Sequence, residues 1–212
     1  MNLVVSGNQK GDTMSLPRFL AAVAACFLLG ASSLAQVIED RQPGVVELQI
    51  ESSRITGLAS LITGPYGAPI PGIEDRLDPI SIFSIHGRLF GITDASSELR
   101  RMSTSLCDLG NVHHRYQQIY RGIEVLTGQV IVHQDPQGRF LAVNGDFYPI
   151  RSQVPTQPDF SLEDAIFLAA GEMKIENPQT LEEKLVIVDP RWYGDPSDGQ
   201  VHLAWHMVIG SE

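Results

Sequence analysis

Hydrophobic and polar residues alternate with a period of two through residues 112–149, and this pattern predicts an antiparallel β-meander. Arg121-Gly122 predicts a bend, and Gly128 predicts a break in the extended stretch that follows. Asp135-Pro136-Gln137-Gly138 predicts a type I turn, because proline suits the second position and glycine the fourth, with a returning strand at 140–143. One face of the first strand is expected to carry alternate side chains: Val112, His114, Tyr116, Gln118 and Tyr120.

Before this meander, apolar residues recur at intervals of three and four, which predicts a helix. Asp78-Pro79-Ile80 supplies an N-cap and a proline at the first helical position, and the pattern ends at Gly91. A further helical turn or two is expected over 95–102, with Leu99 and Met102 facing the core.

A second unit is predicted beyond a polar linker at 151–159. Ser161-Leu162-Glu163-Asp164 has the form of a helix N-terminus. Strands are expected at 185–188 and 201–209, on either side of a loop rich in Pro, Gly and Asp at 189–199. The helix is expected to present four apolar residues at helical spacing: Ala165, Ile166, Ala169 and Met173.

The front of the chain is less well specified. Residues 37–55 alternate weakly and are expected to form an edge strand or a disordered lead, and the repeated Gly and Pro of 57–72 predict a loop. Together the elements predict an α+β fold of two small units, each an antiparallel sheet with one or two packed helices. The units are assigned to 76–150 and 160–212, after a lead and loop at 36–75.

Residues 1–35 have the features of a secretory signal peptide. The apolar run at 19–29 is shorter than the roughly 20 residues that span a bilayer. The small residues that follow it fit the requirements of a signal-peptidase cleavage site before Gln36. Met14 is an alternative start, and Cys26 is a weak candidate for lipidation, since the apolar run continues beyond it. A secreted or periplasmic location is predicted, with no membrane association after signal cleavage.

Composition excludes several classes of function. With 15 Lys and Arg against 25 Asp and Glu, the net charge of −10 disfavours binding to nucleic acid and to anionic membranes. Cleavage of the signal leaves Cys107 as the single cysteine, so neither an internal disulfide nor a zinc–thiolate cluster can form.

The histidines do not predict a metal site. His202 and His206 have the spacing of metallopeptidase ligands, but on a strand they lie about 13 Å apart at roughly 3.3 Å per residue, too far for one zinc ion. His113 and His114 are neighbours on a predicted strand, so their side chains point to opposite faces.

The loop of the second unit offers two weaker candidates. Asp189, Asp195 and Asp198 are oxygen ligands of the kind that calcium prefers, but their spacing lacks a calcium-loop signature and favours a solvated turn. Trp192-Tyr193 is either a contact patch for a partner or a pair of aromatics that anchors the loop on the sheet. No catalytic, cofactor-binding or metal-binding residue is predicted.

The meander and the helix before it carry a recognisable series of motifs: Leu89-Phe90-Gly91, Asp94, Arg115-Tyr116-Gln117-Gln118, Tyr120-Arg121-Gly122-Ile123-Glu124-Val125, Gly128, His133, Gly138 and Val143-Asn144-Gly145. On these motifs, residues 80–149 resemble the fungalysin/thermolysin propeptide domain. Residues 160–212 resemble a PepSY domain, a helix followed by strands, which ends here before the last strand that such domains usually have.

This resemblance implies the pro-region of a secreted thermolysin-like zinc metalloendopeptidase precursor, which acts as an intramolecular chaperone and inhibitor. Its partner would be its own downstream peptidase domain or a related peptidase. Zinc, and calcium as a second candidate, would belong to that catalytic domain and not to residues 1–212. The alternative is a stand-alone exported module that binds or inhibits a peptidase in trans.

Overall fold

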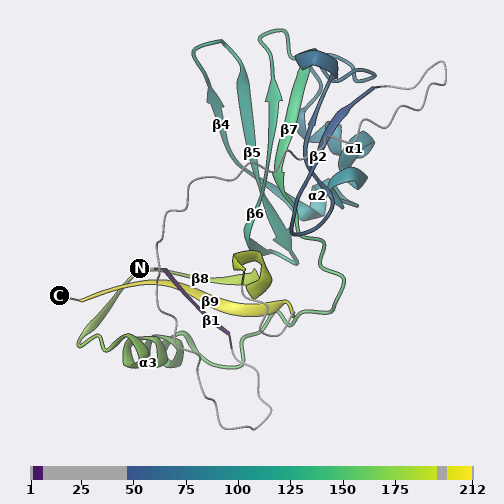
Figure 1. Ribbon diagram of the computed structural model, residues 1–212. Coiled ribbons are helices and arrows are strands. Elements are labelled where there is room, and N and C mark those ends of the chain that lie inside the picture. The colour runs from purple at the N-terminus through teal and green to yellow at the C-terminus, as the bar shows by residue number, and fades with distance from the viewer. Residues whose placement is uncertain (1, 7–46, 195–199, 212) are drawn as a thin grey trace, which may run out of the picture.

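In the computed structural model, which describes residues 2–6, 47–194 and 200–211, the chain forms two lobes (Figure 1). The first lobe contains β2 (Gln49–Ser52), β3 (Ala59–Thr63), the 3₁₀ turns η1 (Pro65–Gly67) and η2 (Pro79–Ser81), α1 (Ile82–Phe90), α2 (Ala95–Glu98), β4 (Leu99–Leu106), β5 (Val112–Tyr120), β6 (Ile123–Gln134) and β7 (Phe140–Asp146). The second contains β1 (Asn2–Ser6), α3 (Leu162–Met173), β8 (Pro178–Val188), the 3₁₀ turn η3 (Pro190–Tyr193) and β9 (His202–Ser211). The α+β class is confirmed.

The meander predicted over 112–149 is present as β5 to β7, and β4, which was not predicted as a strand, extends it by one antiparallel strand. The β5–β6 and β6–β7 pairs are both antiparallel, with a register shift opposite Gln118, where β6 bulges over residues 125–128. The break expected at Gly128 is present in the pairing with β5, whose register skips residues 125–128, although β6 itself continues through this stretch with Thr127 left-handed at φ 63°. The turn before β7 has the predicted hydrogen bond, from Gly138 N–H to the Asp135 carbonyl, at 2.9 Å.

The first helix begins and ends where the sequence predicts. The Asp78 side chain accepts a hydrogen bond from Ile80 N–H at 3.2 Å, and Gly91 ends α1 in the left-handed conformation at φ 86°. The second helix is shorter than predicted, because the chain enters β4 at Leu99. There, backbone pairing with β5 replaces helical hydrogen bonds, so that Leu99 is buried as expected while Met102 is 50% exposed.

The predicted loop at 57–72 is partly wrong, because Ala59–Thr63 forms the strand β3. This short apolar run pairs with β7 on one side and β2 on the other, and Ile62 is fully buried. Pairing on both sides therefore outweighs the Gly and Pro residues that flank the run. β2 confirms the edge-strand alternative for 37–55, of which 37–46 lie outside the described residues.

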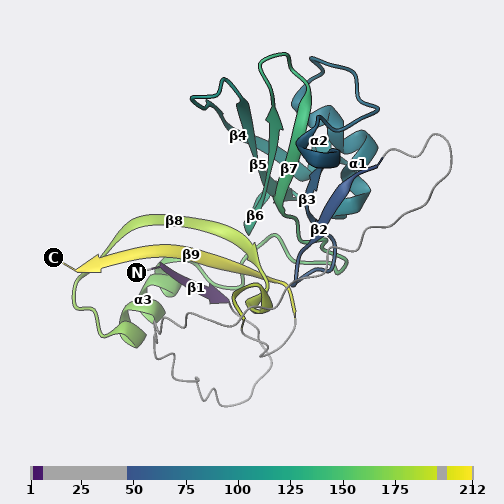
Figure 2. The same ribbon diagram turned by 45° about the horizontal axis from the view of Figure 1, so that its top comes forward.

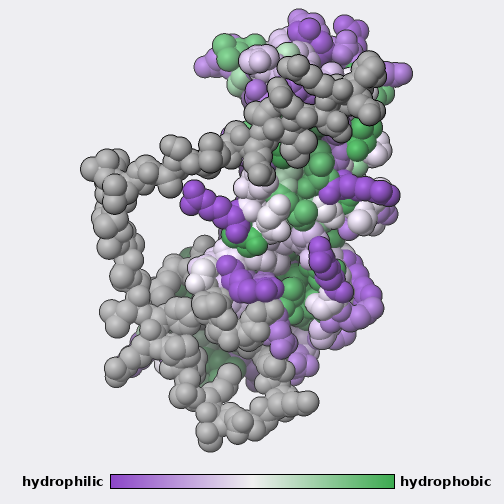
Figure 3. All heavy atoms as spheres, turned by 45° about the vertical axis from the view of Figure 1, so that its right-hand side comes forward, coloured by the Kyte–Doolittle hydropathy of each residue, from purple (hydrophilic) through white to green (hydrophobic). Residues whose placement is uncertain are grey.

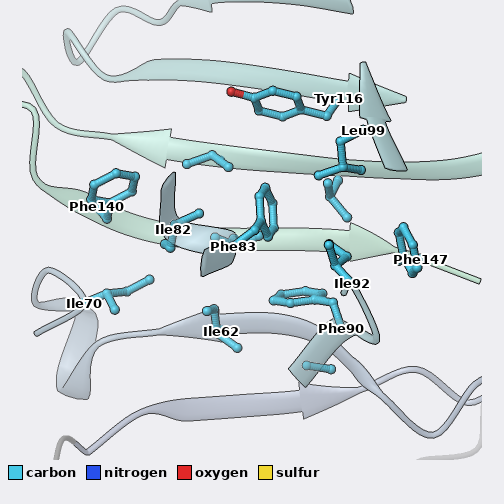
Figure 4. Close-up of a cluster of buried hydrophobic side chains, with 14 residues drawn as sticks. Ile62, Ile70, Ile82, Phe83, Phe90, Ile92, Leu99, Tyr116, Phe140 and Phe147 are labelled. Atoms are coloured by element: carbon cyan, nitrogen blue, oxygen red, sulfur yellow. The ribbon is translucent and has the colours of Figure 1, made fainter. Parts of the chain in front are cut away.

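The core of the first lobe lies between its sheet and α1 (Figure 4). Phe83 meets Phe90 and Tyr116 edge to face, with ring centroids 6.3 and 6.2 Å apart. Phe90 and Ile82 are fully buried against strand residues of the sheet. Burial of this apolar surface holds the lobe together.

In the second lobe, α3 lies against β9 and β8 (Figure 2). Ser161 and Asp164 form a capping box, in which Asp164 N–H donates to the Ser161 hydroxyl at 3.1 Å and the Asp164 carboxylate accepts from Ser161 N–H at 3.3 Å. Ala165 and Ala169 are buried against Met207 and Ile209, as the helical spacing predicts. β8 begins earlier than predicted, at Pro178 instead of 185.

The two lobes share one sheet, which the sequence did not predict. Glu124 and Val125 of β6 pair in parallel with Val186 and Ile187 of β8. Over the described residues, the order of the nine-stranded sheet is β1-β9-β8-β6-β7-β3-β2, with β5 and β4 branching from β6. A parallel partner needs no sequence signal beyond that of a buried strand, so the joint is invisible in the hydrophobic pattern.

Part of the predicted signal peptide is described: Asn2–Ser6 forms β1, antiparallel to β9. Met14, Cys26 and the cleavage site before Gln36 lie outside the described residues. Among the described residues, no helix is long and apolar enough to cross a membrane.

Candidate partner-binding surface

The candidate ligands considered in the sequence occupy separate positions. His202 and His206 lie on β9, four residues apart on one strand, and burial lowers the pKa of His206. His114 is buried, and its Nδ1 lies 3.1 Å from the Thr104 hydroxyl of β4. The side chain of His113 instead contacts His133 of β6. Within the described ranges, no group of three or more His, Cys, Asp or Glu side chains is placed to hold a metal ion.

Asp189 has a structural role at the start of the second lobe's loop. Its carboxylate caps η3 by accepting from Arg191 N–H at 2.9 Å, and it pairs with the Arg191 guanidinium. Burial raises the pKa of Asp189, but the bonds to Arg191 outweigh it and keep the pKa below its ordinary value. Asp195 and Asp198 lie outside the described residues.

Two consecutive glutamines of β5, Gln117 and Gln118, are buried opposite the bulge of β6, at 4% and 3% exposed. The Gln117 side-chain amide donates to the carbonyls of Val125 at 2.6 Å and Gly128 at 2.9 Å. Its oxygen accepts from Gln129 Nε2 at 3.1 Å. The amide thus satisfies backbone groups that the bulge leaves unpaired, which are costly when buried.

Gln118 binds the chain that leaves β7. Its amide donates to the Tyr148 carbonyl at 2.8 Å, and its oxygen accepts from Tyr148 N–H at 2.9 Å. Gly128 lies directly beside this side chain, since a Cβ there would be 2.5 Å from the Gln118 oxygen. These motif residues therefore hold a particular backbone shape and have no free group for chemistry.

Tyr116 and Arg101 connect the sheet to the first helix. Tyr116 is 1% exposed, and its hydroxyl accepts from Arg101 at 3.0 Å. Arg101 also lies 5.5 Å from the Tyr116 ring centroid and donates to Asp78 at 2.8 Å. Burial raises the pKa of Tyr116, so the hydroxyl stays protonated at neutral pH.

Aromatic side chains and charges reinforce the joint between the lobes. Trp192 stacks on Tyr148 with ring centroids 4.1 Å apart, so this tryptophan anchors its loop on the first lobe, whereas Tyr193 is 54% exposed. Glu124 bridges the lobes by pairing with Arg100 of β4 and with Lys184 of β8, the latter at 2.8 Å. Sequence reasoning missed this ion cluster, because its members come from three strands.

Among β4 to β7, the outer edge of β4 is the most accessible part. Among the described residues, β4 pairs with β5 alone, and all of its residues after Leu99 are exposed. Apolar side chains stand out here, with Met102 50% and Leu106 71% exposed. On another side of the molecule, Figure 3 shows hydrophobic residues between hydrophilic ones on both lobes. An open strand edge with apolar side chains is a surface that another chain can extend by pairing.

Comparison with known proteins identifies the meander. No curated protein matches the chain. Among solved structures, the Bacillus megaterium YpeB C-terminal domain is similar at 12% identity and a TM-score of 0.35, over 78% of this chain and 66% of that chain. The matched part thus spans just under two thirds of that protein's chain. A family model, the Fungalysin/Thermolysin Propeptide Motif, matches residues 97–147. The resemblance seen in the sequence is confirmed for this segment: residues 97–147 carry the fungalysin/thermolysin propeptide motif.

Proposed function

We propose that this protein is the pro-region of a secreted thermolysin-like zinc metalloendopeptidase, and that it assists folding of the peptidase domain and inhibits it until the two are separated. The observation that carries the proposal is the propeptide motif at 97–147, which coincides with the meander of the first lobe. Zinc, and calcium where present, belong to the peptidase domain in this scheme. Export follows from the features of residues 1–35 and from the secretion of such peptidases.

The open edge of β4 is the proposed contact with the peptidase. A substrate of an endopeptidase binds in an extended conformation, and β4 presents an extended backbone with one unpaired edge. Met102 and Leu106 would lose exposed apolar area in such a contact. The buried glutamines behind β4 fix the shape of the strand it rests on, β5, so the edge is preformed and little ordering entropy is lost on binding.

Inhibition kinetics and refolding test this function together. The purified full chain is titrated into a thermolysin-like zinc endopeptidase, and the rate of cleavage of a peptide substrate is measured at several substrate concentrations. We expect saturable, competitive inhibition and a higher yield of active enzyme when the denatured peptidase refolds with the chain present. A chain that is folded by circular dichroism yet changes neither quantity across a panel of such peptidases would overturn the proposal.

A matched pair of variants locates the contact. Met102→Lys places a charge on the β4 edge, and we expect inhibition at least roughly tenfold weaker, the effect of about 1.4 kcal/mol. Leu168→Lys, on the helix of the second lobe at 55% exposed, is the control and should inhibit like the parent chain. Equal inhibition by the two variants would show that the β4 edge is not part of the contact, and the proposed inhibitor function would still stand.

A further inference from the structure

Two histidines of the meander face each other across neighbouring strands. His113 of β5 and His133 of β6 are direct partners in the antiparallel register. Their Nδ1 atoms lie 2.6 Å apart, and their rings are 4.8 Å apart at 72°. Both side chains are partly exposed and line a shallow hollow together with Asn144, Asn111 and Glu51. Comparison of His113 with its chain neighbour His114 does not reveal this pair, because the partner comes from another strand.

Asn144 of β7 fixes the protonation of His133. The Asn144 side-chain oxygen lies 2.6 Å from His133 Nε2 and can only accept, so the proton of the neutral ring is on Nε2. The lone pair of His133 is therefore on Nδ1, directed at His113. Metal-binding histidines usually donate their second N–H to an oxygen in this manner, which orients the ring and raises the basicity of the ligating nitrogen.

The surroundings favour a neutral His133. Burial lowers its pKa; the bond to Asn144 opposes this, and the nearby His113 and Arg115 lower it further. Arg115 is the cation on the same side of β5, and its guanidinium is bound to the Gln129 oxygen at 2.9 Å. Glu51, an exposed carboxylate on the rim of the hollow, supplies charge of the opposite sign.

The geometry points to a divalent transition-metal site in which His113 Nδ1 and His133 Nδ1 are the protein ligands. Tetrahedral zinc at about 2.0–2.1 Å from each nitrogen needs the two nitrogens about 3.3 Å apart, so the rings must separate by roughly 0.7 Å from their present contact. A small rotation of the partly exposed His113 ring accomplishes this. Without metal, His113 Nδ1 carries the proton that lies between the two rings. When the metal binds, this proton moves to His113 Nε2, so that both Nδ1 lone pairs face the metal.

The chemistry of the ligands sets the class of metal. Two imidazole nitrogens favour Cu²⁺ over Zn²⁺ and Ni²⁺, following the general order of affinity for nitrogen sites. Over the described part of the chain no third protein ligand completes a closed site, so water or an external donor fills the remaining positions, which face the hollow. The site is therefore open and exchangeable, unlike a structural zinc site.

Titration of the untagged full chain with Cu²⁺, and separately with Zn²⁺, tests this site. Calorimetry measures affinity and stoichiometry, and electron paramagnetic resonance of the Cu²⁺ form reports nitrogen coupling. We expect one saturable site whose Cu²⁺ spectrum shows two equivalent imidazole nitrogens. His113→Gln and His133→Gln should each abolish it, and Asn144→Ala should weaken it by about 10–100-fold through loss of the orienting bond.

His114→Gln is the matched control, because it removes the adjacent histidine that faces the other side of β5. Its affinity should equal that of the parent chain, with folding of every variant verified by circular dichroism. Binding that survives in both His113→Gln and His133→Gln, or the absence of any saturable site in the parent chain, would overturn the inference. Neither result bears on inhibition of a peptidase, since the β4 edge is tested separately.

Discussion

The two lobes bury side chains in different ways. Among its described residues, the first lobe has a core of fourteen buried hydrophobic side chains, and it also buries Gln117 and Gln118, whose amides bond backbone groups of the neighbouring segments. In the second, four buried residues form the cluster under α3, and Phe167 of this helix is 79% exposed. The motif-bearing lobe is thus specified by polar bonds as well as by apolar burial, whereas the helix of the second lobe is held mainly by apolar contact.

The largest effect is expected from one substitution in each lobe. Phe90→Ala removes a fully buried ring from the first core and should lower the free energy of unfolding by about 3–5 kcal/mol. Phe167→Ala, the matched change on α3, should stay within about 0.5 kcal/mol, because the ring is exposed. Denaturant unfolding measures both. A comparable loss for Phe167→Ala would mean that its ring is covered in solution, and the comparison of the lobes would fail.

The second test concerns the polar bonds. Gln118→Ala leaves the Tyr148 N–H and carbonyl without partners in a buried place, and we expect a loss of about 2–4 kcal/mol. Gln153→Ala, which removes an exposed amide bonded to Arg121 at 3.1 Å, should change stability by less than about 0.5 kcal/mol. Denaturant unfolding is again the measurement. If both changes cost little, the buried amides do not specify the first lobe.

The smallest effect is expected at the joint, as a change in pH dependence. Burial raises the pKa of Glu124, but the bond and charge of Lys184, with the charge of Arg100, outweigh it, so the folded pKa lies below the ordinary 4.5. The stabilising contribution is therefore present above pH 4.5 and is lost as the pH falls through the folded pKa.

Glu124→Gln removes this contribution and should cost about 0.2–1 kcal/mol at pH 7, because Arg100 and Lys184 are half exposed. Below the folded pKa the variant and the parent should be equally stable. Unfolding curves at a series of pH values measure the difference. A constant difference at all pH values would show that the charge of Glu124 does not contribute to the joint.

Local patterns predicted much of the fold. Asp78, Gly91 and Ser161 mark helix ends because capping depends on a few neighbouring atoms. The strand at 59–63 was missed because its pairing with two distant strands, and not its own sequence, makes it a strand. The prediction that Met102 faces the core was wrong for the same reason, because pairing with β5 ends the helix before this residue.

The candidate site was less predictable than the fold. Periodicity places His113 and His114 on opposite faces of β5, and this is correct, but it gives no information on the opposing residue in β6. Trp192 left two interpretations open in the sequence, and stacking on Tyr148 selects the anchoring one. Contacts between strands depend on register, which the hydrophobic pattern and the connecting turn specify, and the bulge of β6 shifts the register between that turn and His133.

The parallel pairing of β6 with β8 also has a kinetic consequence. The bridging residues Glu124 and Lys184 are 60 positions apart, and β7 and α3 lie between them in the chain. Contacts between residues so far apart in the chain form late in folding. The chain must first lose the conformational entropy of the intervening loop, before the contacts can stabilise it. The β4–β7 hairpins, joined by short turns, can assemble first. A nascent chain would therefore present a finished first lobe while the rest is still being completed, and docking of the second lobe would be the slow, final event.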